Sequence, residues 1–462
     1  MTPEAWFTLL VVAATVVALV REWFPPHVVL LGAMSVFLVT GVTTPGRAFS
    51  GFTNPAPLTV AALWVLARAV NRTGALRPLV AGVLSGRDGE RSRLLRIVVP
   101  TAGASAFLNN TPVTAMLISP IVRWAEERGR DPGLYLMPLS FAAILGGMLT
   151  LVGTSTNLVV SGLVEETGRR PLGMFEMTPV AAPAVCVGLL IVVALTPRLL
   201  PRRDPVTFPA GVGASGRKGD PSVAGSDPDP SGEDGSDRTG TSPEPAEAGE
   251  PMEAPGGLGE GTNRLRSWLA LGSVAGVVGS AALGWIPIVY GAVGAVALLV
   301  VTGALSPWEA VRSVDFGVIL LIASAFGVGA AIEDSGLAGV LAGGLVGAAQ
   351  DLGAVAVLAG VALCTLVLTE LITNNAAAVL MFPIALAAAS VVEVEPRAFI
   401  WAVALVASAS FLTPIGYQTN AMVYGAGRYR FGDYARLGTP VALGVAISVV
   451  LGIATHWELW GS

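Results

Sequence analysis

Apolar stretches of about twenty residues recur along the whole chain, and this pattern restricts the fold more than any other feature. A helix of about that length crosses the hydrocarbon core of a bilayer. Of the 462 residues, 53% are hydrophobic and 13% are charged. In soluble domains about a quarter of all residues are charged. The sequence therefore predicts an all-α polytopic membrane protein, with the lipid bilayer as its first partner.

The stretches predict five crossings in each half, near residues 5–20, 26–44, 55–71, 133–163, 178–200, 267–283, 284–305, 316–332, 398–427 and 438–457. The arginine-rich loops lie at residues 87–96, 123–130, 198–203, 264–266 and 428–436. All of them fall on one side of the membrane if residues 97–122 enter and leave the membrane from that same side. The positive-inside rule makes that side cytoplasmic. We therefore expect a multi-pass protein of the cell (cytoplasmic) membrane.

Residues 204–262 interrupt this pattern with a run of Pro, Gly, Ser, Asp and Glu that lacks apolar periodicity. Such a segment cannot bury enough apolar surface to offset the entropy of ordering it. We expect a disordered, acidic, cytoplasmic linker between two membrane parts, 1–203 and 263–462. An inert tether is the favoured interpretation, and a regulatory role is the alternative.

Three short motifs occur in the same order in both halves. Residues 69–74 (AVNRTG) match 331–336 (AIEDSG), 107–111 (FLNNT) match 372–376 (ITNNA), and 153–157 (GTSTN) match 416–420 (GYQTN). From Asn110 to Asn157 is 157 − 110 = 47 positions, and from Asn375 to Asn420 is 420 − 375 = 45. Two repeats with an odd number of crossings must have opposite orientations, which is the inverted-repeat plan of secondary transporters.

The Asn-Asn pairs interrupt two apolar runs, 97–122 and 354–392, each of which predicts a helical hairpin that dips into the membrane from one side. Helix N-termini at the hairpin tips would attract an anion. Side-chain and unwound backbone oxygens suit a hard cation such as sodium. Stretches 153–157 and 413–420 predict matching broken helices, with Pro414 and Gly416 favouring the second break. The alternative is that these polar residues only join packed helices.

The remaining polar residues exclude several function classes. Cys186, Cys364, His27 and His456 lie in or beside apolar runs and form no metal or catalytic pattern, and a net charge of −5 offers no basic surface for nucleic acid. We interpret the cysteines as small buried hydrophobes. Glu370 stands inside an apolar helix, where a carboxylate is costly. It could bind a cation, carry a proton, or accept hydrogen bonds from a nearby backbone break.

Together these motifs resemble the divalent anion/sodium symporter family of the ion transporter superfamily, over essentially all of the chain except the linker. In that family each inverted repeat carries a re-entrant hairpin with a Ser-Asn-Thr tip and a broken helix. The likeness is greatest to the branch whose second hairpin reads TELITNNAA, as residues 369–377 do here. The resemblance implies sodium sites at both tips, an anion between the two Asn residues, an elevator-type motion and a homodimer.

Carried over by position, the resemblance assigns residues to two roles. The substrate would contact Asn110, Thr111, Asn375, Thr156, Asn157, Thr419 and Asn420. Sodium ions would contact Asn109, Asn110, Gly153, Thr154, Ser155, Asn374, Asn375, Thr413 and Gly416. Glu370 is the candidate for coupling, and no catalytic residue or other cofactor is implied.

The chain departs from the family at both tips. The first tip position is Asn in place of Ser, and the third position of the second tip is Ala376, which lacks a hydroxyl. The regulatory domains that this branch usually carries between the halves have no room in residues 204–262. No basic residue stands at either tip, so helix dipoles and co-bound cations would have to hold the anion.

The sequence thus predicts a secondary transporter for sodium-coupled uptake of a small divalent anion, sulfate or a related oxyanion before a dicarboxylate. The rival within transport is an arsenite-efflux or sodium/proton antiport carrier, which a proton-active Glu370 would favour. A channel or a membrane-embedded enzyme is the rival from another class. An enzyme would need a nucleophile, base or metal cluster inside the membrane, and the sequence offers no His, Cys or paired-carboxylate constellation there.

Overall fold

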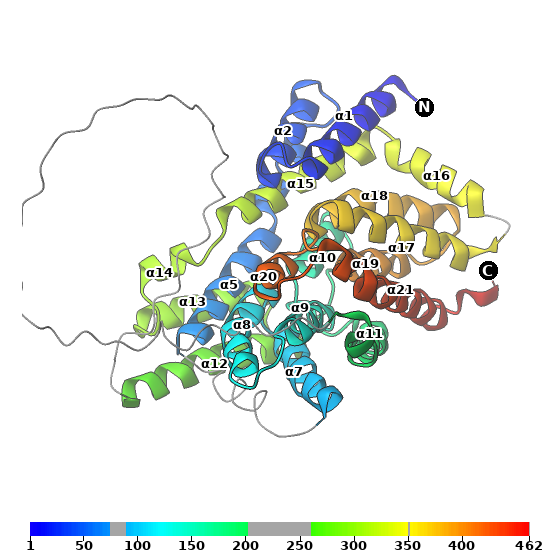
Figure 1. Cartoon of the computed structure of the whole chain (residues 1–462). Coiled ribbons are helices and arrows are strands. Elements are labelled where there is room, and N and C mark those ends of the chain that lie inside the picture. The colour runs from blue at the N-terminus through cyan, green and yellow to red at the C-terminus, as the bar shows by residue number, and fades with distance from the viewer. Residues whose placement is uncertain (74–88, 202–259, 350–351, 462) are drawn as a thin grey trace, which may run out of the picture.

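The computed structural model describes residues 1–73, 89–201, 260–349 and 352–461, and within these ranges the chain is helical and contains no strand (Figure 1). The first half contains α1 (Pro3–Val20), α2 (Pro26–Val39), α3 (Pro45–Ala48), α4 (Ser50–Thr53), α5 (Pro55–Thr73), α7 (Glu90–Ser105), α8 (Asn110–Glu126), α9 (Gly133–Gly147), α10 (Ser155–Glu166) and α11 (Thr178–Leu199).

The second half contains α12 (Glu260–Ala282), α13 (Ile288–Val301), α14 (Pro307–Arg312), α15 (Phe316–Asp334), α16 (Leu337–Ala349), α17 (Ala354–Leu371), α18 (Asn374–Val391), α19 (Pro396–Ala407), α20 (Gln418–Ala426), α21 (Phe431–His456) and a short 3-10 turn (Leu459–Gly461).

Seven helices in the described part are long and apolar enough to cross a membrane: α1, α11, residues 265–282 of α12, α15, α17, α18 and α21. Large apolar side chains such as Val39, Leu190 and Val301 are exposed on the helix surfaces, as expected where lipid replaces water. The chain is a multi-pass membrane protein. Cys186 and Cys364 are exposed as well; the prediction that they are buried was wrong, because an apolar run can face lipid as well as the protein core.

The predicted crossings and hairpins coincide with helices. Stretches 133–163 and 398–427 are each two helices separated by a break, α9–α10 and α19–α20, and the two hairpins are α7–α8 and α17–α18. The apolar helix α16 was not among the expected crossings. The linker expected over 204–262 lies outside the described residues, except that 260–262 begin α12. The arms α17 and α18 are long enough to cross, so the depth of that hairpin stays a prediction.

Packing between the halves is reciprocal. Helix α2 of the first half packs on α15 of the second, and α13 of the second half packs on α5 of the first. In the same way α10 contacts α18, and α20 contacts α8. In both halves, the hairpin arms pack on the helix that precedes the break, α9 or α19. Each half therefore completes its broken helix against the hairpin of the other half.

Two separate hydrophobic clusters hold the helices. The larger contains α9, in which all residues from Gly133 to Gly147 are buried, and α19, which is buried from Ala398 to Ala407. The smaller joins one face of α5 to α12 and α13 through residues such as Leu66, Val277 and Leu299. Figure 1 shows α5, α12, α13 and α14 gathered on one side, and α17, α18, α19 and α21 on the other. The C-terminal part of α5 therefore packs in a different cluster from the second hairpin, while Ala56 and Val60 at its start join the larger cluster.

Gly146 is where the first hairpin packs most closely on α9. A Cβ atom there would lie 2.2 Å from the carbonyl oxygen of Ala102 in α7, and backbone cannot move aside as a side chain can. We expect Gly146→Ala to lower the free energy of unfolding by about 1–3 kcal/mol, measured by denaturation in detergent. Gly103→Ala is the matched control, since its Cβ would meet open space; equal stability of the two variants would contradict this packing.

Candidate functional site

Each hairpin tip is a helix N-terminus. Asn109 caps α8, with its side-chain oxygen accepting a hydrogen bond from Thr111 N at 3.4 Å. Thr373 caps α18, with its hydroxyl accepting from Ala376 N at 3.4 Å. Asn and Thr are favoured at this position because a short polar side chain satisfies a free backbone N–H. The polar interruption of each apolar run is therefore also the start of the second arm.

Each broken helix restarts at a similar N-terminus. Thr154 precedes the first residue of α10, and Tyr417 precedes the first residue of α20. Neither side chain caps the helix that follows it. An asparagine one turn into each helix folds back on the break: Asn157 Nδ2 donates to Thr150 O at 2.9 Å, and Asn420 Nδ2 donates to Thr413 O at 3.3 Å. The first-turn N–H groups of α10 and α20 are therefore left without side-chain caps.

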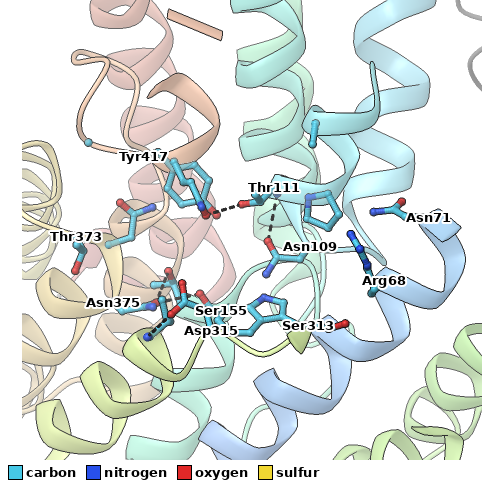
Figure 2. Close-up of a pocket in the computed structure, with 18 of the residues that line it drawn as sticks. Arg68, Asn71, Asn109, Thr111, Ser155, Ser313, Asp315, Thr373, Asn375 and Tyr417 are labelled. Atoms are coloured by element: carbon cyan, nitrogen blue, oxygen red, sulfur yellow. Dashed lines mark hydrogen bonds between the residues drawn. The ribbon is translucent and has the colours of Figure 1, made fainter. Parts of the chain in front are cut away.

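The tips and the breaks converge on one cavity of about 640 Å³ (Figure 2). Helix α5 and the segment between α14 and α15 complete its wall. The lining residues are Trp64, Arg68, Asn71, Asn109, Thr111, Pro112, Ala115, Ser155, Thr156, Arg312, Ser313, Asp315, Val318, Thr373, Asn374, Asn375, Ile415, Gly416, Tyr417 and Gln418. Two repeated motifs from each half thus meet in a single space.

Side chains link each tip to the break of the opposite half. Thr111 Oγ1 donates to Gln418 Oε1 at 3.0 Å. Asn375 Oδ1 accepts from Ser155 Oγ at 3.3 Å and from Thr156 Oγ1 at 3.1 Å. These are equivalent contacts, since Ser155 and Gln418 are the first residues of α10 and α20. The two halves therefore build the cavity in the same way.

The contacts correct the register of the second tip. The motif alignment paired Asn110 with Asn375, but Asn110 begins α8 and Asn374 begins α18. Ser105 Oγ lies 2.6 Å from the side-chain amide of Asn110, and Thr369 Oγ1 lies 2.9 Å from that of Asn374, in both cases five residues apart. Asn375 therefore corresponds to Thr111. The second tip reads Thr373-Asn374-Asn375, and Ala376 does not occupy its third position.

Asn110 is enclosed by protein. It does not line the cavity, and its amide lies between Ser105 Oγ and, at 2.8 Å, Tyr417 Oη. With its oxygen toward Tyr417, its NH₂ group also faces the carbonyl oxygens of Ala143 at 3.0 Å and Gly153 at 3.2 Å. This amide joins the first hairpin to both breaks, which suits a residue that positions the site.

Glu370 binds the second break directly. Its Oε1 accepts from Phe411 N at 2.6 Å and Leu412 N at 2.8 Å, and its Oε2 accepts from the backbone N and the hydroxyl of Thr413, both at 3.2 Å. Of the roles considered for this carboxylate, the geometry matches hydrogen bonding to a backbone break. Its oxygens already receive four donors.

The structure divides the predicted site residues into two groups. Those that line the cavity are Asn109, Thr111, Ser155, Thr156, Asn374, Asn375 and Gly416. Those that lie behind its wall are Asn110, Gly153, Thr154, Asn157, Glu370, Thr413, Thr419 and Asn420. Among the latter, Ser140 Oγ of α9 contacts Thr419 Oγ1 at 2.8 Å and Asn420 Oδ1 at 2.7 Å. The ligand roles of both groups stay predictions.

Sequence reasoning missed the charged part of the cavity. Arg68, Arg312 and Asp315 line it, so charged side chains stand beside the uncharged tips, and which groups would hold an anion stays a prediction. A signal existed for Arg68, because an arginine inside a predicted crossing is costly and marks a functional position. Arg312 and Asp315 lie between two crossings, and only the fold brings them to the tips.

The comparisons with known proteins decide the family. The model of the CitMHS citrate transporter family matches residues 16–406. The chain belongs to this family. It is a membrane transporter and not an enzyme.

Several relatives support this assignment. An uncharacterized transporter of Synechocystis is 29% identical over 590 aligned positions, covering 97% of this chain and 95% of the relative. Sodium/sulfate cotransporter 2 of Chlamydomonas reinhardtii is 36% identical over 168 residues, 36% of this chain and 19% of that protein. The sodium-dependent dicarboxylate transporter SdcS of Staphylococcus saprophyticus is 27% identical over 144 residues, 31% of this chain and 28% of that transporter. The crystal structure of the YdaH transporter of Alcanivorax borkumensis shares the fold, with a TM-score of 0.61 at 14% identity over 99% of both chains.

Proposed function

We propose that this transporter takes up a small divalent anion together with sodium ions. The observation that carries the proposal is the convergence of four helix N-termini, those of α8, α10, α18 and α20, on one cavity. Each N-terminus carries about half a positive charge and free N–H donors. Four of them around one space favour an anion. The names of the sodium/sulfate and sodium-dependent dicarboxylate relatives agree with this.

An unused oxygen at the first break supports a cation site. Among the described residues, Asn157 Oδ1 is buried without a hydrogen-bond partner. A buried oxygen left unpaired costs on the order of 1–3 kcal/mol, and a sodium ion would remove that cost. At the second break the equivalent oxygen, Asn420 Oδ1, already accepts from Ser140. We therefore place the stronger sodium site at the first break.

Charge balance gives the reason for coupling. A dianion that enters a cell alone moves two charges against the membrane potential, each costing about 2.3 kcal/mol per 100 mV. Sodium ions bound beside it cancel that cost and supply the driving force. The cavity volume of about 640 Å³ admits sulfate and larger dicarboxylates, and we propose sulfate or a related oxyanion as the first candidate.

The proposal extends to the way the protein moves. The reciprocal contacts support two inverted repeats, and the separate cluster around α5 supports a fixed scaffold past which the hairpins and broken helices slide as an elevator. Residues of α14 and of the C-terminal half of α5 line the cavity, and we propose that it opens on their side, which the arginine pattern makes cytoplasmic. We further propose a homodimer in the cell membrane, with the linker in the cytoplasm. The antiport rival loses support because Glu370 is engaged by the second break.

Uptake into proteoliposomes tests this function. We expect an inward sodium gradient to raise the initial rate of labelled sulfate uptake about tenfold or more over a potassium control, because a tenfold gradient supplies about 1.4 kcal/mol per ion. Succinate and phosphate are measured in parallel to identify the preferred anion. Uptake that ignores sodium and follows a proton gradient would contradict the proposed coupling.

A further inference from the structure

One face of α5 forms the wall of the cavity opposite the second hairpin tip. Trp64, Arg68 and Asn71 are spaced four and three residues apart, so they lie on the same side of the helix, and all three line the cavity. Figure 2 shows Arg68 and Asn71 projecting from α5 beside Asn109, across the space from Asn375. The opposite face of α5 packs on α12 and α13.

Arg68 differs from the neighbouring arginines, Arg72 and Arg312, in its interactions. One turn later, Arg72 forms an ion pair with Glu309. Arg312 lies over the ring of Trp308, with the guanidinium carbon 5.2 Å from the ring centre. Within the described ranges, Arg68 has no carboxylate, hydrogen-bond or ring partner, and its side chain is exposed to the cavity. A guanidinium beside four helix N-termini is repelled by their dipoles unless an anion lies between them.

The matching position of the other half carries no charge. The first motif pairs Ala69 with Ala331, an offset of 331 − 69 = 262, which places Ala330 of α15 opposite Arg68. Ala330 lines a second cavity, of about 710 Å³, together with Arg47 and Glu333. There Arg47 is neutralised, since it pairs with Glu333 and Asp334, while Arg169 lines the cavity from the segment after α10. The position on α15 that matches Arg68 is therefore uncharged, and the two cavities carry their arginines on different segments.

We propose that Arg68 is a specificity-determining residue that pairs with the second negative charge of the transported dianion, and that it does so only while the site faces the side of the first cavity. The inference rests on the proposed function. A guanidinium binds two oxygens of a sulfate or carboxylate in parallel, which neutral tips cannot do. Arg68 lies on α5, which packs on α12 and α13. If the hairpins and broken helices slide past α5 with the bound anion, Arg68 stays in place and no longer contacts that anion.

The binding test compares Arg68→Gln and Arg68→Lys with the wild-type protein, using labelled sulfate and purified transporter in sodium buffer. We expect Arg68→Gln to raise the Kd for sulfate about tenfold and to lower the preference for sulfate over nitrate. Arg68→Lys should recover most of the affinity. Arg47→Gln is the matched control, and its Kd should not change because Arg47 is held by two carboxylates.

The side of action is tested by transport. Uptake into right-side-out and inverted membrane vesicles should show a raised KM for Arg68→Gln on one face only, with kcat changed less than about twofold. An unchanged Kd, a lysine variant as weak as the glutamine variant, or an equal rise in KM on both faces would overturn the role of Arg68 alone. A wild-type protein that binds neither sulfate nor succinate would overturn this role and the proposed function together.

Discussion

Replacing Asn375 by alanine should lower sodium-driven anion uptake by about 50-fold or more while the protein still inserts and folds. The side-chain oxygen of Asn375 accepts hydrogen bonds from Ser155 and Thr156, and the residue lines the cavity at the start of α18. Its loss leaves two hydroxyls without their partner and removes the proposed contact to the anion, at a cost on the order of 2–3 kcal/mol. Initial uptake rates in proteoliposomes measure the effect.

A second variant separates ligand binding from packing. Asn375→Asp keeps an oxygen that accepts from Ser155 and Thr156 but places a negative charge beside the proposed anion. It should fold as stably as the wild type and still transport poorly. Near-normal flux in both variants would show that Asn375 only packs between helices, and it would contradict the proposal that the second tip binds the anion.

Glu370→Ala should destabilise the protein by about 3 kcal/mol, because three partly buried backbone N–H groups and one hydroxyl lose their acceptor. Those groups belong to Phe411, Leu412 and Thr413, which hold the second break in place. Unfolding in detergent measures the loss. Uptake should fall as well, since the break positions the N-terminus of α20.

Glu370→Gln distinguishes this role from proton coupling. The amide keeps one acceptor oxygen but presents an NH₂ group to the remaining donors, so its stability should lie between those of the wild type and the alanine variant. A glutamine variant of wild-type stability that loses only the pH dependence of transport would show that Glu370 carries a proton, and would contradict the capping role.

The hairpins, the breaks and the pairing of halves could be predicted because local chemistry determines them. Asn109 and Thr373 are good helix caps at the interruption of an apolar run, and Pro414 and Gly416 disfavour a continuous helix. Repetition of these signals in the same order then indicated the segments that line one cavity. No long-range information was needed for that part.

The errors arose where two choices satisfy the same local pattern. An Asn-Asn doublet can be aligned in either of two registers, and only the helix start at Asn374 decides between them. An apolar run does not tell lipid from protein, so Cys186 and Cys364 were assigned to the wrong side. Arg68 was passed over because its meaning depends on which helix faces the tips.

Protection of a cysteine inside the cavity tests the central claim most directly. Ala115 lines the cavity on α8, and Ala115→Cys in a chain with Cys186→Ser and Cys364→Ser offers one thiol there. Binding of the anion between the two tips predicts that sulfate, or the anion preferred in uptake, slows maleimide labelling of this thiol in sodium and much less in potassium. A labelling rate that the transported anion leaves unchanged in both salts, in protein that still transports it, would contradict the account.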